Sequence, residues 1–121
     1  MKYKIDVVRI RENSIELNGW VIGKTPQSRA EFQVQDGNRE PVEFRYVATR
    51  RDDVSQIYYK QVYDRDYGFD IRFPYTRGAD YWLLIRCDGK TARIKFNEEL
   101  IAKRASVAHK RMEKIRDLMN M

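Results

Sequence analysis

The sequence predicts an all-β domain, an antiparallel β-sandwich of the jelly-roll or immunoglobulin-like type with about seven to eight strands and one C-terminal α-helix. Between Lys4 and Phe96, apolar residues recur at every second position in short segments, which is the period of half-buried strands. Strong turn sequences such as Asp36-Gly37-Asn38 separate these segments. After Asn97 the apolar period changes to helical spacing, so we expect a β-sandwich domain over residues 1–97 and a basic amphipathic helix over residues 98–121.

The composition is sufficient for one hydrophobic core and argues about binding partners and cellular location. The 121 residues include five Phe, eight Tyr and two Trp, enough large apolar side chains for a single two-layer core. The net charge is +6, but acidic residues interrupt the basic ones along most of the chain, which argues against a nucleic-acid domain. Cys87 is the only cysteine, so no intrachain disulfide can form and a cytoplasmic location is expected. Residues 1–11 contain no continuous apolar stretch, so we expect no signal peptide or membrane span there.

The first two strands are expected at Tyr3–Arg11 and Ile15–Ile22, joined by a tight polar turn at residues 12–14 into a hairpin. Gly19 lies within the second of these strands and is expected to permit a kink or bulge. The adjacent Trp20 is expected to lie in the core, where its ring would cover the gap beside the glycine.

A second hairpin is predicted across the turn at residues 36–38, between a strand marked by Phe32 and Val34 and a strand over residues 42–48. From residue 49 to residue 67 the alternation disappears. This segment is expected to be a long connection with a turn of helix at Asp53–Tyr58, and long connections inside compact domains are often functional.

The last three strands follow in close succession. A strand at residues 69–73 ends at Pro74, and the continuous apolar run within Tyr81–Cys87 predicts a central strand, with Trp82 in the core. Asp88-Gly89-Lys90 then predicts a third hairpin, to a strand that ends at Phe96.

The terminal helix carries a thin apolar stripe at helical spacing, while Lys and Arg occupy much of its remaining surface. We expect the stripe to pack on the sandwich or on a partner, including a second copy of the chain. Membrane-surface or nucleic-acid binding by this helix is the less favoured alternative. The stripe consists of Ile101, Ala105, Ala108, Met112, Ile115 and Met119.

No catalytic residue, metal site or cofactor is predicted. A zinc site needs several Cys or His at ligand spacing, and this chain offers only Cys87 and His109. A Cys–His or Ser–His nucleophile would depend on His109, which lies in the basic terminal helix and is interpreted as a surface residue. Asp64-Arg65-Asp66 has the aspartate spacing that some enzymes use to hold a divalent ion, but no Gly-rich phosphate loop accompanies it. We therefore interpret it as a solvated loop.

Four tyrosines within the long connection form the best candidate recognition surface: Tyr58, Tyr59, Tyr63 and Tyr67. Basic residues are interleaved with them. Flat rings can lie against the apolar faces of sugars while charged side chains bond hydroxyl groups. The alternative is that some of these tyrosines close the edge of the sandwich with their hydroxyls in water.

Three short motifs resemble the β-sandwich region that precedes the catalytic domain in some bacterial family 2 glycosyltransferases of rhamnan-type and capsular polysaccharide synthesis. They are Asn18-Gly19-Trp20, Arg51-Asp52-Asp53-Val54 and Gly68-Phe69-Asp70-Ile71. The resemblance spans essentially the whole chain, with one departure at Asp52, where the pattern often has proline. It implies that residues 1–97 are an accessory module and that residues 98–121 connect to a covalently attached glycosyltransferase domain.

The resemblance implies a noncatalytic domain, not an enzyme in its own right, that holds a glycan or orients the catalytic domain. Arg51 and Asp53 would then either bind ligand or pair with each other to hold the long connection, and pairing is favoured. An interaction module without a sugar ligand, such as a homodimer formed through the C-terminal helix, is the main alternative. An oligonucleotide-binding barrel is the third, and it would require Lys and Arg gathered beside aromatic rings on one sheet face.

Overall fold

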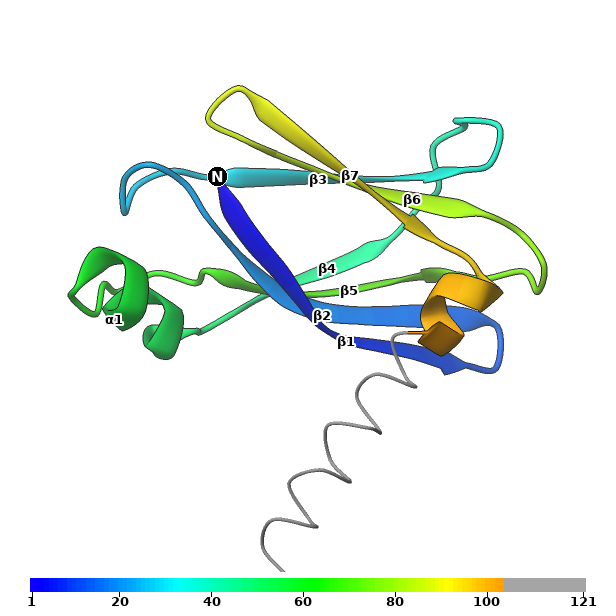
Figure 1. Ribbon diagram of the computed structural model, residues 1–121, viewed down its shortest axis with the longest axis horizontal. Coiled ribbons are helices and arrows are strands. Elements are labelled where there is room, and N and C mark those ends of the chain that lie inside the picture. The colour runs from blue at the N-terminus through cyan, green and yellow to red at the C-terminus, as the bar shows by residue number, and fades with distance from the viewer. Residues whose placement is uncertain (104–121) are drawn as a thin grey trace, which may run out of the picture.

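The protein is a two-layer antiparallel β-sandwich in a computed structural model that describes residues 1–103 (Figure 1). Seven strands form the two sheets, and one short helix, α1, lies between β4 and β5. The elements are β1 (Lys2–Arg11), β2 (Ser14–Ile22), β3 (Ala30–Asp36), β4 (Arg45–Thr49), α1 (Asp52–Tyr59), β5 (Gly68–Pro74), β6 (Tyr81–Cys87) and β7 (Lys90–Phe96). Residues 98–103 are also helical. The predicted fold class is confirmed.

One sheet has four strands in the order β1-β2-β5-β4, and the other has three in the order β3-β6-β7. Every pair of neighbouring strands is antiparallel. The central position of β6 agrees with the continuous apolar run of its sequence. Strands β3 and β4 are both edge strands, and they belong to different sheets.

The predicted second hairpin is wrong. β3 pairs with β6 and β4 pairs with β5, and the segment between them leaves β3 after a single bridge between Gln35 and Pro41. The amide of Val42 still donates to the carbonyl of Val34 at 2.8 Å. Pro41 has no amide hydrogen with which to extend a ladder, and the partly buried side chains of Val42 and Phe44 pack against the core as the chain crosses to the other sheet.

The first hairpin forms as predicted, with an irregularity opposite Gly19. β1 and β2 pair from Lys2 to Arg11, and the register shifts between Ile5 and Val7. Gly19 faces Ile5 on one side and Phe69 of β5 on the other. The bulge therefore lies in the strand beside the glycine, in β1.

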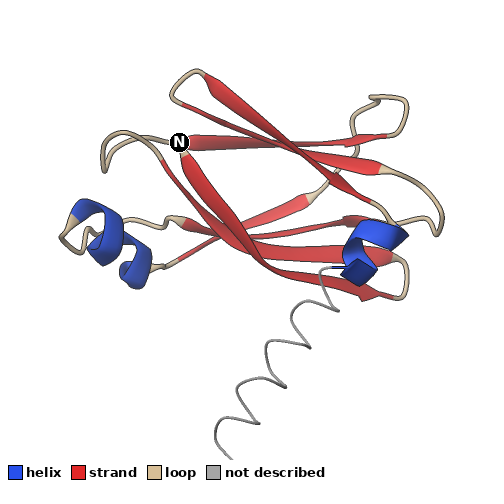
Figure 2. Ribbon diagram, viewed as in Figure 1, coloured by secondary structure: helices blue, strands red, loops and turns tan. Residues whose placement is uncertain are grey.

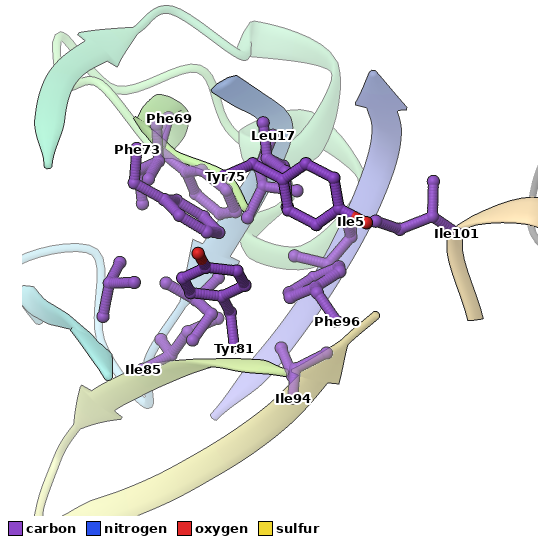
Figure 3. Close-up of a cluster of buried hydrophobic side chains, with 14 of the residues drawn as sticks. Ile5, Leu17, Phe69, Phe73, Tyr75, Tyr81, Ile85, Ile94, Phe96 and Ile101 are labelled. Atoms are coloured by element: carbon purple, nitrogen blue, oxygen red, sulfur yellow. The ribbon is translucent and has the colours of Figure 1, made fainter. Parts of the chain in front are cut away.

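The main core lies between the sheets and consists of the side chains on their inner faces, including Leu17, Ile71, Leu83, Ile85 and Phe96 (Figure 3). Strand alternation brings these side chains together, because successive residues point to opposite faces of a sheet.

The C-terminal helix begins on the sandwich. The Asn97 side chain accepts a hydrogen bond from the Leu100 amide at 2.9 Å, which is an N-cap. Ile101 is buried and points into the main core cluster (Figure 3). One member of the predicted stripe thus packs on the sandwich. Ala105, Ala108, Met112, Ile115 and Met119, like His109, lie outside the described residues.

A second, smaller core lies beneath α1, at the opposite end of the sandwich from residues 98–103 (Figure 2). It contains Trp20, Ile22, Val54 and Tyr67, so Trp20 is a core residue as predicted.

No helix within residues 1–103 is long and apolar enough to span a bilayer.

Trp82 does not lie in the core. It is only partly buried and pairs across strands with Gln35 and Lys95, on the face of the three-stranded sheet that points away from the other sheet. The prediction failed because residues 82–85 form an unbroken apolar run, and in a strand half of such a run must point outward. Only Leu83 and Ile85 of that run are fully buried.

Candidate functional site

The four predicted tyrosines lie together around α1, but most of their surface is internal. Tyr67 is only 6% exposed and belongs to the smaller core, while Tyr59 and Tyr63 are half-buried against it. The Tyr59 ring lies 5.5 Å from the Tyr67 ring and 6.1 Å from the Tyr63 ring, centroid to centroid. Tyr58 is the most open of the four at 38% exposure, and its ring packs 5.2 Å from that of Trp20.

The hydroxyl groups of Tyr59 and Tyr67 have partners within the protein. The Tyr59 hydroxyl lies 2.8 Å from the carbonyl of Gly23 and 2.9 Å from that of Thr25. The Tyr67 hydroxyl donates to the carbonyl of Pro26 at 2.9 Å. Burial raises the pKa of both tyrosines, so both remain protonated donors at neutral pH. These two rings therefore hold the loop at residues 23–29 against the α1 segment.

Arg51 and Asp53 pair with each other at the start of α1. The Arg51 guanidinium donates to both carboxylate oxygens of Asp53, at 3.0 and 2.9 Å. It also donates to Asp6 at 2.7 Å, beside the bulge of β1. The hydrogen bond from Arg51 holds the pKa of Asp53 below its usual value. Arg51 thus ties the first turn of α1 to the edge of the four-stranded sheet.

Ser55 has a structural role that the sequence did not reveal. Its side chain is fully buried, donates to the Gln61 carbonyl at 2.6 Å and accepts from the Tyr63 amide at 3.1 Å. It therefore stabilises the turn that follows α1. A lone serine on a short helix carries no sequence pattern that would predict this role.

A hollow lies at the edge of β3. We call it the edge groove; its volume is about 680 Å³. It extends from the mouth between the two sheets onto the outer face of the three-stranded sheet. Its lining residues are Ala30, Glu31, Phe32, Gln33, Phe44, Tyr46, Leu84, Arg86 and Thr91.

A smaller hollow of about 250 Å³ adjoins the edge groove, because Ala30, Phe32 and Tyr46 line both. Its wall includes Arg65 and Asp66 from the long connection. The Arg65 guanidinium donates to the carbonyl of Pro26 at 2.9 Å, which fixes its position beside the hollow. Tyr67 also lines this hollow, so part of the long connection borders the site, whereas Tyr58, Tyr59 and Tyr63 do not line it.

Aromatic rings and hydrogen-bonding groups meet in the edge groove. The rings of Phe32 and Tyr46 lie 5.2 Å apart and are inclined by 31°. Tyr46 is 47% exposed. Burial of its hydroxyl, together with the carboxylate of Asp66, raises its pKa, so the group is a neutral hydrogen-bond donor. Gln33 and Arg86 add planar donors close to these rings. The groove can hold a ligand with both apolar and hydroxyl-bearing surfaces.

Sequence reasoning missed the edge groove because of the wrong hairpin. If β3 and β4 had paired, Phe32 and Tyr46 would have been neighbours within one sheet. In the structure they lie on the edge strands of two sheets, and the hollow opens where these edges separate.

Cys87 is buried, and its burial raises the pKa of the thiol, which stays protonated at neutral pH. Among residues 1–103, no three His, Cys, Asp or Glu side chains gather as metal ligands.

Asp88 anchors the loop that borders the smaller hollow. Its carboxylate accepts from the Lys24 amide at 2.7 Å and from the Ser28 hydroxyl at 2.9 Å. These bonds, led by that from the Lys24 amide, lower the pKa of Asp88. Gly23 leaves room for them, since a Cβ there would lie 2.4 Å from Asp88 Oδ2.

We expect Asp88→Asn to destabilise the protein at pH 6, and the effect to shrink as the pH is lowered toward 2. A carboxyl whose pKa is lower in the folded state stabilises the fold above its unfolded pKa of about 3.9. That contribution is lost as the pH falls through the folded pKa. Urea unfolding of both proteins between pH 6 and pH 2 measures the difference. Glu40→Gln, at an exposed site, is the control and should show no such trend; an Asp88→Asn effect independent of pH would contradict this prediction.

Comparison of the sequence with protein-family models and with curated proteins finds no match to either.

Proposed function

We propose that this chain is a noncatalytic domain that binds carbohydrate in the edge groove, as an accessory module of a polysaccharide-building glycosyltransferase. The observation that carries the proposal is the lining of the groove, where the rings of Phe32, Phe44 and Tyr46 lie beside the polar groups of Gln33 and Arg86. A pyranose ring presents C–H groups on its faces and hydroxyl groups around its rim. Such a ligand matches aromatic rings flanked by planar hydrogen-bonding side chains.

The position of the groove also supports binding to a polymer. It lies along an edge strand and is open toward solvent, so it is accessible to a long chain. The association with a glycosyltransferase rests on the three sequence motifs. In the structure residues of all three have structural roles: Gly19 of the first lies against Phe69 of the third, and Arg51 and Asp53 of the second pair with each other. These roles suit a scaffold that presents a binding surface elsewhere.

The test is a glycan-array screen followed by affinity measurement for the glycans that bind. We expect Tyr46→Ala to weaken binding by about three- to tenfold, since loss of a stacked ring costs roughly 0.5–1.5 kcal/mol. Tyr3→Ala is the matched control, because Tyr3 is 40% exposed on β1, at the opposite edge of the same sheet. It should bind as the unmodified protein does.

Tyr58→Ala separates the edge groove from the tyrosine surface around α1. If Tyr58→Ala loses binding and Tyr46→Ala retains it, the ligand lies on the tyrosine surface and the edge groove is the wrong site. If no glycan binds the unmodified protein, the carbohydrate proposal itself is wrong.

A further inference from the structure

The outer face of the three-stranded sheet is a second feature of the binding surface. Alternate residues of β3, β6 and β7 point away from the core, and neither α1 nor the helix at residues 98–103 covers them (Figure 1). Strand pairing places nine side chains on this face in three rows: Gln35–Trp82–Lys95, Gln33–Leu84–Arg93 and Glu31–Arg86–Thr91.

The edge groove continues onto this face, because five of the nine side chains also line the groove. Alternate residues along a strand are about 6.8 Å apart, so the three rows extend about 14 Å along the sheet. Trp82, Arg93 and Lys95 lie beyond the part that the groove itself includes. A ligand seated in the groove and longer than a single sugar would reach them.

Positive charge exceeds negative charge on this face. Arg86, Arg93 and Lys95 are basic, and Glu31 is the acidic member of the three rows. Lys95 pairs with Asp80 at 3.6 Å. Within residues 1–103, neither Arg86 nor Arg93 takes part in an ion pair. Two guanidinium groups thus remain available to an anionic ligand.

Trp82 holds one of these guanidinium groups in place. The Arg93 guanidinium carbon lies 4.9 Å from the centroid of the Trp82 ring, and Lys95 Nζ lies 5.7 Å from it. Cation–π contact of this kind restricts a long side chain before any ligand arrives. A guanidinium group also matches a carboxylate with two parallel hydrogen bonds.

We infer that the carbohydrate bound by this domain is an acidic polysaccharide, whose carboxylates contact Arg86 and Arg93 while its sugar rings occupy the edge groove. This inference rests on the proposed function and specifies the class of ligand. Single-stranded nucleic acid fits the face less well. Binding of that kind uses exposed rings arranged so that successive bases can stack on them. On this face Trp82 is the one aromatic side chain of the three rows, and two cations already lie beside its ring. The rings of Phe32 and Tyr46 lie in the edge groove and pack on each other, with centroids 5.2 Å apart.

The test compares ligands that differ only in charge. Binding of polygalacturonate, alginate and hyaluronan is measured beside that of their methyl esters and of neutral dextran. We expect the acidic polymers to bind at least tenfold more tightly than their esters, with an affinity that falls as salt is added. Arg86→Gln and Arg93→Gln should each weaken acidic binding about threefold, and the double variant about tenfold. Arg9→Gln, on β1 of the other sheet, is the control and should change little.

The outcomes separate this inference from the proposed function. If the esters or dextran bind as tightly as the acidic polymers, the domain binds carbohydrate but the inference about charge is wrong. Equal salt dependence in Arg93→Gln and the unmodified protein would also contradict it. If no polysaccharide binds and poly(dT) does so in an Arg93-dependent way, the face binds nucleic acid and both proposals fail. If neither polymer class binds, both proposals fail as well.

Discussion

Gly19→Ala is expected to destabilise the protein by about 3 kcal/mol, because the sandwich has no space for a methyl group at this position. A Cβ at residue 19 would lie 2.1 Å from the carbonyl oxygen of Lys4 and 2.8 Å from Cζ of Phe69. The first of these atoms is backbone in the neighbouring strand, beside the bulge, so it cannot move without disturbing the β1–β2 ladder. Urea unfolding gives the free energy of unfolding for both proteins.

Two further variants make this prediction specific. Gly37→Ala is the matched control, since a Cβ there would meet Asp80 atoms only at 3.7 and 3.8 Å; we expect a change within about 0.5 kcal/mol. Phe69→Leu combined with Gly19→Ala should not restore stability, because the contact with the Lys4 carbonyl remains. If stability recovers in this double variant, then the clash with the Phe69 ring, and not the clash with the backbone of β1, causes the destabilisation.

Leu83→Ala is expected to lower the free energy of unfolding by about 2–5 kcal/mol. Leu83 is fully buried on the inner face of β6, the central strand of its sheet. Removing its side chain leaves a cavity between the two sheets, where the surrounding side chains can close in only partly. The same urea titration measures the loss.

Leu84→Ala is the control for Leu83→Ala, because it removes the same atoms one residue further along the same strand. Leu84 is partly buried on the outer face and lines the edge groove. We expect a smaller loss, of about 1 kcal/mol, since Leu84 keeps part of its surface in water and its removal opens no cavity between the sheets. Equal losses at the two positions would contradict the register of β6 and the two-layer arrangement with it.

Much of the fold could be predicted from sequence because strand alternation and turn residues are local signals. The turns at residues 12–14 and 88–90 define hairpins whose strands do pair, and the helix predicted at Asp53–Tyr58 agrees with α1. The turn at residues 36–38 led to the wrong prediction of a β3–β4 hairpin, because the sheet that a strand joins depends on strands distant in the sequence. Hydrogen bonds with β6 and β5, not the local turn, decide where β3 and β4 lie.

The candidate site was less predictable for the same reason. Tyr58, Tyr59, Tyr63 and Tyr67 form a clear cluster in sequence, but whether a ring points inward depends on what packs beneath it. The smaller core around Trp20 takes up much of their surface. The edge groove combines residues from β3, β4, β6 and β7, which no local pattern connects. Pairing of Arg51 with Asp53 was foreseeable because the two residues are close in sequence.

The most direct test of the edge groove as a carbohydrate site is to map ligand-induced changes in amide chemical shifts by NMR, with polygalacturonate fragments and with the best ligand from the glycan array. We expect changes at residues 30–33, 44–46, 84–86 and 91, with α1 unaffected. Changes centred on Tyr58 and the rest of α1, or no change at any residue with either ligand, would contradict it.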